Sequence, residues 1–239
     1  MFSAHGVSPA VREEADARNL EVIDATCPFV TKVHHEVRRY AKKAYTVLLI
    51  GHRRHDEIEG IVGEAPGNVR VLESPEEARE VHVADPERVA VMTQTTLSVT
   101  DTADVIDILR ARFPAIEAPP KSDICYATHN RQRAVRHLAR LCDLILVLGA
   151  RNSSNTNRLA EVAAACGANV RLVTAISDLP TSTVENAQII GISAGASTPE
   201  SFVTQVVHYI GENWPISTQE VSVVEEDVHF RVPAKLRER

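Results

Sequence analysis

Two cysteines lie among polar residues that suit a metal-binding or nucleophilic thiol. Cys27 lies at a predicted strand-to-helix turn, and Cys125 lies at or just before a predicted helix N-terminus. The free N–H groups and the positive end of a helix stabilise a thiolate, which is the form that binds metal or attacks a substrate. Although a lone cysteine is more often simply buried, polar neighbours favour a functional role for Cys125. These neighbours are Asp123, Thr128, Asn130, Arg131 and Gln132.

The loop at residues 51–60, GHRRHDEIEG, is dense in titratable side chains. His52, His55 and Glu57 are compatible with a metal-binding set, an acid–base pair or a solvated turn, and a solvated turn is the commonest fate of such residues. Their spacing does not match the zinc-binding helix pattern HExxH. The residues alone leave these three alternatives open.

Two further loops carry uncharged hydrogen-bond donors beside glycines. Ser153, Ser154 and Asn155 lie in one loop, and Ser197 lies in the other. Donors of this kind at helix N-termini suit phosphate oxygens. A serine at a helix start is often only a cap, but two such loops together favour anion binding.

Strands and helices alternate along the chain, and this alternation predicts small parallel α/β domains joined near residues 119–120. Ligands of open parallel sheets collect at the carboxyl ends of the strands, so we expect the polar loops to converge. The predicted strands cover residues 20–23, 46–50, 69–72, 89–92, 144–148, 170–173 and 188–192. The predicted helices start near Pro9, Ser74 and Cys125, cover about 29–42, 100–112 and 200–211, and include one that passes through Cys166. Residues 221–232 are expected to form one more strand or an extended tail.

Composition is that of an ordinary globular protein. The chain has 239 residues, of which 44% are hydrophobic and 24% are charged, which suffices for two domains with well-formed cores. A net charge of −6 without a long basic tract argues against nucleic acid as a partner. No apolar run approaches the roughly 20 residues of a membrane span, and no signal-peptide pattern starts the chain, so we expect a cytoplasmic protein. The widely spaced cysteines predict reduced thiols or metal ligands, with Cys142 and Cys166 purely structural.

Seven motifs in order carry a close resemblance to a known family. They are SAHGVSP, DATCPFVTKVH, GHRRHDEIEG, TQTTLSV, DICYATHNRQ, NSSNTNRL and SAGASTPE. Together they resemble the 4-hydroxy-3-methylbut-2-enyl diphosphate reductases, the IspH or LytB family, over essentially the whole chain. The resemblance implies α/β domains in a trefoil around a 4Fe-4S cluster. It divides the chain into a first-domain remnant at 1–26, a second domain at 27–120, a third at 121–211 and a C-terminal tail at 212–239.

The resemblance also implies the reaction. Enzymes of this family reductively remove the hydroxyl of (E)-4-hydroxy-3-methylbut-2-enyl diphosphate, giving isopentenyl and dimethylallyl diphosphate in the non-mevalonate pathway. Two electrons come from ferredoxin or flavodoxin. The implied diphosphate-binding residues are His5, His55, Ser153, Ser154, Asn155 and Ser197.

Glu57 is implied as the proton donor, Thr95 lies near the substrate hydroxyl, and Asn155 also holds the substrate or its water. A carboxyl group beside an anionic diphosphate in a closed site is expected to have a raised pKa, because like charge and desolvation both oppose its ionisation. A cluster with three cysteine ligands leaves one iron open for the substrate hydroxyl.

Cys27 and Cys125 match two of the three cluster thiolates of the family. The third belongs to a Gly-Phe-Cys-Ala-Gly-Val segment that has no counterpart in this sequence, so most of the first domain is expected to be absent. An internal start of the reading frame or a true short form would each explain this, and we expect the first. The non-enzyme alternative is a catalytically incomplete fragment that binds diphosphate or iron without turnover.

Overall fold

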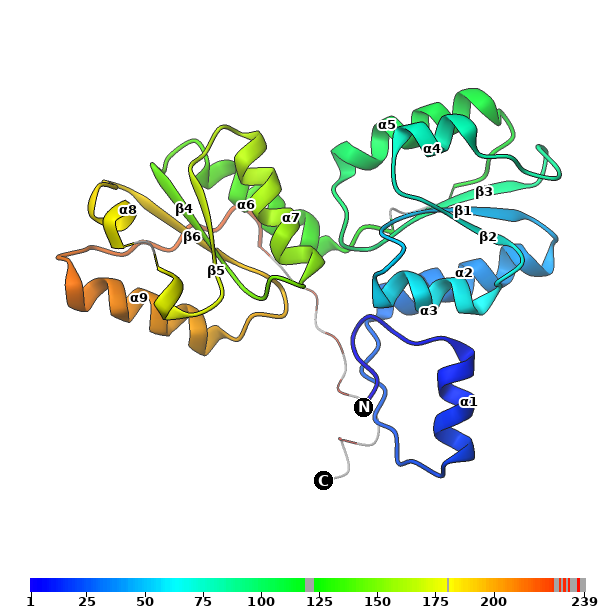
Figure 1. The fold of residues 1–239 in the computed structure, drawn as a ribbon, viewed down its shortest axis with the longest axis horizontal. Coiled ribbons are helices and arrows are strands. Elements are labelled where there is room, and N and C mark those ends of the chain that lie inside the picture. The colour runs from blue at the N-terminus through cyan, green and yellow to red at the C-terminus, as the bar shows by residue number, and fades with distance from the viewer. Residues whose placement is uncertain are drawn as a thin grey trace. The chain divides into compact units, whose positions relative to one another are not determined.

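The computed structural model describes residues 1–118, 123–179 and 181–225, together with Val228, Phe230, Val232 and Leu236. The chain forms two compact units (Figure 1). The first contains Met1–Cys125 with Asp227–Arg239, and the second contains Tyr126–Glu226. The division at residues 26, 120 and 211 and the trefoil arrangement stay predictions. The predicted linker at residues 119–120 lies outside the described residues.

The first unit is built on a parallel three-stranded sheet in the order β2-β1-β3. Its strands are β1 (Thr46–Ile50), β2 (Val69–Leu72) and β3 (Val89–Thr93). Side chains of β1 point alternately to the two faces, so Leu49 packs with the helices of one face and Leu48 with those of the other. The first face is covered by α2 (Pro28–Lys42) and α3 (Asp56–Glu64), and the second by α4 (Pro75–Glu80) and α5 (Val99–Arg112), as Figure 1 shows.

The second unit repeats this plan with a parallel sheet in the order β5-β4-β6. Its strands are β4 (Leu144–Leu148), β5 (Val170–Val173) and β6 (Ile190–Ala194). One face carries α6 (Tyr126–Leu138) and α7 (Ser154–Ala165), and the other carries η1 (Ile176–Asp178), α8 (Thr181–Glu185) and α9 (Glu200–Asn213). The prediction of parallel α/β sheets is therefore confirmed.

Strand order explains why the polar loops pair up within each unit. β1 is hydrogen-bonded to β3, and β4 is hydrogen-bonded to β6. In parallel strands the carboxyl ends meet at one edge of the sheet. The loops that follow β1 and β3 therefore lie side by side in the first unit, and those that follow β4 and β6 lie side by side in the second.

Two expectations about the N-terminal half are wrong. Residues 20–23 form no strand. The N-terminal segment beside them pairs through Phe2, which donates to the carbonyl oxygen of Ile23 and forms an isolated bridge with Asp24. This segment then turns at Gly6, whose φ is +74°. The loop at 51–60 is shorter than expected, because α3 begins at Asp56. The His55 ring caps this helix, and acidic residues fill its first turn, where they complement the helix dipole.

The remaining differences are small. The helix predicted near Pro9 is present as α1 (Pro9–Ala17), with the proline in its first turn. β6 begins at Ile190, two residues after the predicted start at residue 188. The described residues of the stretch 221–232 form no strand. Within the described parts of the chain, no helix combines the length and the apolar character that crossing a membrane requires.

Candidate active site

Glu57 is a fully buried carboxyl group at the start of α3. Its backbone N–H donates to Nδ1 of His55, at 3.1 Å. Its two carboxylate oxygens accept from a single residue in the loop after β3: Oε1 from the backbone N–H of Thr95 at 2.7 Å, and Oε2 from the Thr95 hydroxyl at 2.9 Å. Because β1 and β3 are neighbours in the sheet, the fold itself brings Glu57 to Thr95.

The pKa of Glu57 is raised to about 7, and burial is the main cause. The two hydrogen bonds from Thr95 act in the opposite direction, while the negative charges of Cys125 and Asp123 raise the pKa further. The rise has the direction expected from the sequence, although burial alone produces most of it here. Near neutral pH a substantial fraction of Glu57 therefore carries a proton that it can donate.

Two histidines lie beside this carboxyl group. The rings of His5 and His55 meet edge to face with centroids 4.9 Å apart, and ligand atoms of His5, His55 and Glu57 all lie within 4.8 Å of one another. Burial lowers the pKa of His55 to about 4, so its ring is neutral at pH 7. Since Nδ1 accepts the capping hydrogen bond, Nε2 of the neutral ring carries the proton and can donate to an anion.

The titratable residues of the loop at 51–60 differ in their surroundings. His52 is exposed, as in a solvated turn, whereas Glu57 is buried. A metal bound by His5, His55 and Glu57 would compete for carboxylate oxygens that already accept from Thr95 and for the capping nitrogen of His55. The arrangement therefore favours an acid beside hydrogen-bond donors over a three-ligand metal site.

Cys27 and Cys125 are adjacent in the first unit. Cys27 is the N-cap residue of α2, where the backbone N–H groups of Phe29 and Val30 act to lower the pKa of its thiol. A hydrogen bond with the Cys125 thiol, followed by burial, raises the pKa of Cys27. The backbone N–H of Cys125 donates to the carbonyl oxygen of Thr95 at 2.9 Å, so Thr95 connects the thiol pair to Glu57. Cys125 directly precedes α6, as predicted.

The second unit brings its two polar loops together through glycines. Ser153 caps α7 by accepting from the Thr156 N–H at 3.3 Å. A Cβ atom on Gly195 would lie 2.2 Å from the Thr156 hydroxyl, and one on Gly149 would lie 2.5 Å from it. Only glycine, which has no side chain, allows the Thr156 hydroxyl to lie this close to positions 149 and 195. The loop of Ser153 and the loop that contains Ser197 therefore lie against each other.

Two buried polar atoms in the first turn of α7 have no hydrogen-bond partner: Oδ1 of Asn155 and Oγ1 of Thr156. Buried polar groups are normally paired, so an unpaired one at a helix N-terminus is consistent with a ligand that binds there. Ser154 is half-buried and Ser197 is exposed. The sequence prediction named Asn155 and not Thr156, although the motif NSSNTN contains both.

The geometry agrees with a comparison to known proteins. The sequence profile described as LytB protein matches residues 1–211. The chain belongs to the LytB family. The 4-hydroxy-3-methylbut-2-enyl diphosphate reductase of Actinobacillus succinogenes is 48% identical over 240 residues, covering 99% of this chain and 76% of that protein. The enzyme with the same name from Pectobacterium carotovorum subsp. carotovorum is 50% identical, with the same coverage.

Solved structures of LytB-type enzymes are similar as well. The E-1-hydroxy-2-methyl-but-2-enyl-4-diphosphate reductase of Plasmodium falciparum has a TM-score of 0.90 and 34% identity, and the match covers 100% of this chain and 77% of that one. A second reductase, described as the terminal enzyme of the non-mevalonate pathway, has a TM-score of 0.58 and 32% identity over 87% of this chain and 74% of its own.

Members of the LytB family use a 4Fe-4S cluster. Thiolates are the usual ligands of such clusters, and the chain places two thiols side by side; the pKa of the free Cys27 thiol is raised, but a thiol that coordinates a metal is deprotonated by the metal. These two residues therefore fit the group. The other cysteines lie in the second unit, where the sulfur of Cys142 faces Gly191 and Cys166 is exposed at the end of α7.

Proposed function

We propose that the chain is a 4-hydroxy-3-methylbut-2-enyl diphosphate reductase of the non-mevalonate pathway. The substrate hydroxyl leaves as water, and two electrons and two protons are consumed as isopentenyl and dimethylallyl diphosphate form. The observation that carries the proposal is the connection of a buried carboxyl group, whose pKa is about 7, to a pair of adjacent thiols through one residue, Thr95. An acid beside a redox centre is what a reductive dehydroxylation requires.

Cys27 and Cys125 are proposed as two thiolate ligands of a 4Fe-4S cluster. Cys27 and Cys125 would hold such a cluster, which would pass the two electrons of the donor to the substrate one at a time and offer an iron to its hydroxyl. Cys142 and Cys166 are not proposed as ligands, because the sulfur of Cys142 faces Gly191 within the second unit and Cys166 is exposed at the end of α7. The proposed electron donor is ferredoxin or flavodoxin.

Glu57 is proposed as the catalytic acid. A carboxyl group with a pKa near the working pH both holds a proton and releases it readily, which suits proton delivery. Thr95 holds both carboxylate oxygens in place and presents its hydroxyl at the same position, so we place it near the substrate hydroxyl.

Two groups of residues, one in each unit and described separately, are proposed to contact diphosphate. His55 offers a proton on Nε2, and His5 lies against its ring. In the second unit, the donors surround the N-terminus of α7, where Asn155 carries an unpaired buried oxygen that we assign to the substrate or its water. The proposed diphosphate-binding residues are His5, His55, Ser153, Ser154, Asn155 and Ser197.

We further propose a cytoplasmic location. All four cysteines are free, and free thiols persist in reducing compartments.

Anaerobic reconstitution with iron and sulfide tests the proposal. If the chain is a reductase, the parent protein forms isopentenyl and dimethylallyl diphosphate, whereas a catalytically incomplete fragment does not. In either case Cys125→Ser is expected to bind less iron than the parent, and Cys166→Ser is the matched control that keeps the iron content of the parent. Iron content and product analysis give the answer. A parent protein that binds substrate without forming product would favour the alternative of a diphosphate-binding fragment. Equal iron content in parent and Cys125→Ser would contradict the cluster assignment.

A further inference from the structure

Residues 123 and 124, just before Cys125, are buried in the first unit. Along the chain, Cys125 is followed directly by α6 of the second unit. Its own backbone N–H is bound by Thr95. Ile124 before it is a buried apolar residue, and the side chain of Asp123, only 2% exposed, makes specific polar contacts. The position of the thiol therefore depends on what holds Asp123.

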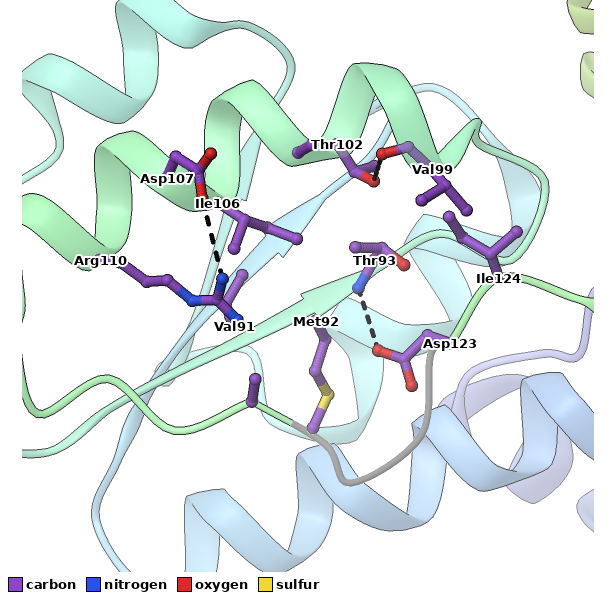
Figure 2. Close-up of a pocket in the computed structure, with 12 residues that line it drawn as sticks. Val91, Met92, Thr93, Val99, Thr102, Ile106, Asp107, Arg110, Asp123 and Ile124 are labelled. Atoms are coloured by element: carbon purple, nitrogen blue, oxygen red, sulfur yellow. Dashed lines mark hydrogen bonds and ion pairs between the residues drawn. The ribbon is translucent and has the colours of Figure 1, made fainter.

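Asp123 connects three parts of the first unit. Its Oδ2 accepts from the backbone N–H of Thr93, at the end of β3, at 3.2 Å, as Figure 2 shows. Its Oδ1 lies 3.0 Å from Nζ of Lys32, in the second turn of α2. The same helix has Cys27 at its N-cap. The pair Lys32–Asp123 thus joins the helix of one thiol to the segment of the other.

Burial makes this ion pair more than a surface contact. Asp123 borders a pocket of about 260 Å³ with mainly apolar walls, such as Val91, Met92 and Ile106 (Figure 2), and such walls do not solvate a charge. The Lys32 side chain is 30% exposed and brings its ammonium group to the buried carboxylate. Removing one partner of such a pair leaves a buried charge without compensation, which is strongly destabilising locally.

We infer that Lys32 and Asp123 are positioning residues that hold Cys125 next to Cys27. Without the lysine, Asp123 would move toward water and take the segment 123–125 with it. Without the carboxylate, this segment would lose its ion pair with α2 and its hydrogen bond from the N–H of Thr93. In either case the two thiols would separate. The inference rests on the proposed role of the thiol pair, but it concerns the position of the sulfur atoms and can be measured on them directly.

Phenylarsine oxide is a suitable probe, because its arsenic binds two neighbouring thiols. Two As–S bonds form, the oxide oxygen leaves with the two thiol protons as water, and arsenic stays trivalent. The test uses the full chain without iron, with Cys142→Ala and Cys166→Ala so that two thiols remain. This parent is expected to bind the probe much more tightly than its Cys27→Ser variant. Asp123→Asn and Lys32→Met are each expected to weaken binding by about tenfold or more.

The double variant separates a shared role from two independent ones. If the residues act as one clamp, Lys32→Met with Asp123→Asn binds the probe no more weakly than the worse single variant. The matched control is Asp143→Asn, because Asp143 also accepts two backbone N–H groups, from Gln188 and Ile189 at 3.0 and 2.9 Å, but lies in the second unit. It is expected to lower stability while leaving probe affinity unchanged.

Distinct results overturn the inference and its premise. Single variants within twofold of the parent, additive losses in the double variant, or an equal loss in Asp143→Asn would each overturn the clamp. If Asp123→Asn does not fold, as judged by circular dichroism, Lys32→Met is compared with Lys32→Arg instead. Only Lys32→Met is then expected to lose affinity for phenylarsine oxide. A parent that binds the probe no better than Cys27→Ser would contradict the thiol pair itself, and with it the proposed cluster site.

Discussion

At the scale of single residues, the site depends on a carboxyl group that the fold keeps away from water. Glu57 receives two hydrogen bonds from Thr95, yet burial outweighs them and its pKa rises to about 7 from an ordinary value of 4.5. The protein therefore holds an acid that is partly protonated at neutral pH, at a cost in stability. Active sites commonly carry such a cost.

This cost predicts a pH-dependent effect of Glu57→Gln on the free energy of unfolding. Below about pH 4.5 the carboxyl group is neutral in both the folded and the unfolded chain, so its ionisation costs nothing. As the pH rises to about 7, the unfolded chain ionises first and the folded state loses stability, and above pH 7 the full penalty is present. Glutamine avoids this penalty.

Denaturant unfolding at pH 5 and pH 8 measures the effect. Relative to the parent, the variant is expected to gain about 2–3 kcal/mol more at pH 8 than at pH 5. A difference between variant and parent that does not change with pH would show that Glu57 ionises normally in the folded protein.

At the scale of elements, the second unit uses the starts of its helices. The Ser153 hydroxyl caps α7, whose N-terminus also carries the unpaired oxygen of Asn155. Capping and anion binding are compatible roles for the same loop, but they differ in what a substitution changes. A lost cap lowers stability, whereas a lost ligand contact lowers affinity.

Ser153→Ala combined with Ser197→Ala separates these roles. Each hydrogen bond to a charged group is worth about 1.5–3 kcal/mol, so the dissociation constant for inorganic diphosphate is expected to rise about 100-fold or more. The matched control is Ser74→Ala, because Ser74 caps α4 at the same distance of 3.3 Å but lies outside the site. It is expected to lower the Tm and leave affinity unchanged. Calorimetric titration beside a thermal melt shows whether the double variant instead behaves like this control.

The approach of the two loops predicts a second effect. Gly195→Ala places a Cβ atom 2.2 Å from Oγ1 of Thr156, so the loops must move apart and diphosphate binding is expected to weaken. Adding Thr156→Ala removes the clashing hydroxyl and is expected to restore part of the affinity. The control Gly67→Ala meets no atom within 4 Å and is expected to bind normally. Affinity of Gly195→Ala equal to that of this control would contradict a site between these loops.

At the scale of the whole molecule, local sequence patterns predict the strands and helices, whereas packing between distant segments determines which side chains meet in the site. β1 was predicted to the residue because an apolar run between turn residues is a strong strand signal. The start of α3 at Asp56 was missed, because a histidine cap is not among the usual helix-start signals.

Several contacts of the site join residues that are far apart in the chain. The rings of His5 and His55 meet edge to face, and Lys32 pairs with Asp123 across 91 positions. The sequence motifs named His5 and His55 as candidates but contained no signal for the pairing of Lys32, which is an ordinary polar residue of a predicted helix. Only the packing of α2 against β3 and the segment of Cys125 reveals its role.

In the proposed reaction Glu57 supplies protons to a reductive dehydroxylation. The measurement that tests it most directly compares the anaerobically reconstituted parent with Glu57→Gln, acting on (E)-4-hydroxy-3-methylbut-2-enyl diphosphate with an excess of chemical reductant. Because glutamine keeps the shape of the site but has no proton to give, substrate binding is expected to persist while product formation falls by about 10² to 10⁴. Turnover of the variant within a few-fold of the parent would contradict the claim.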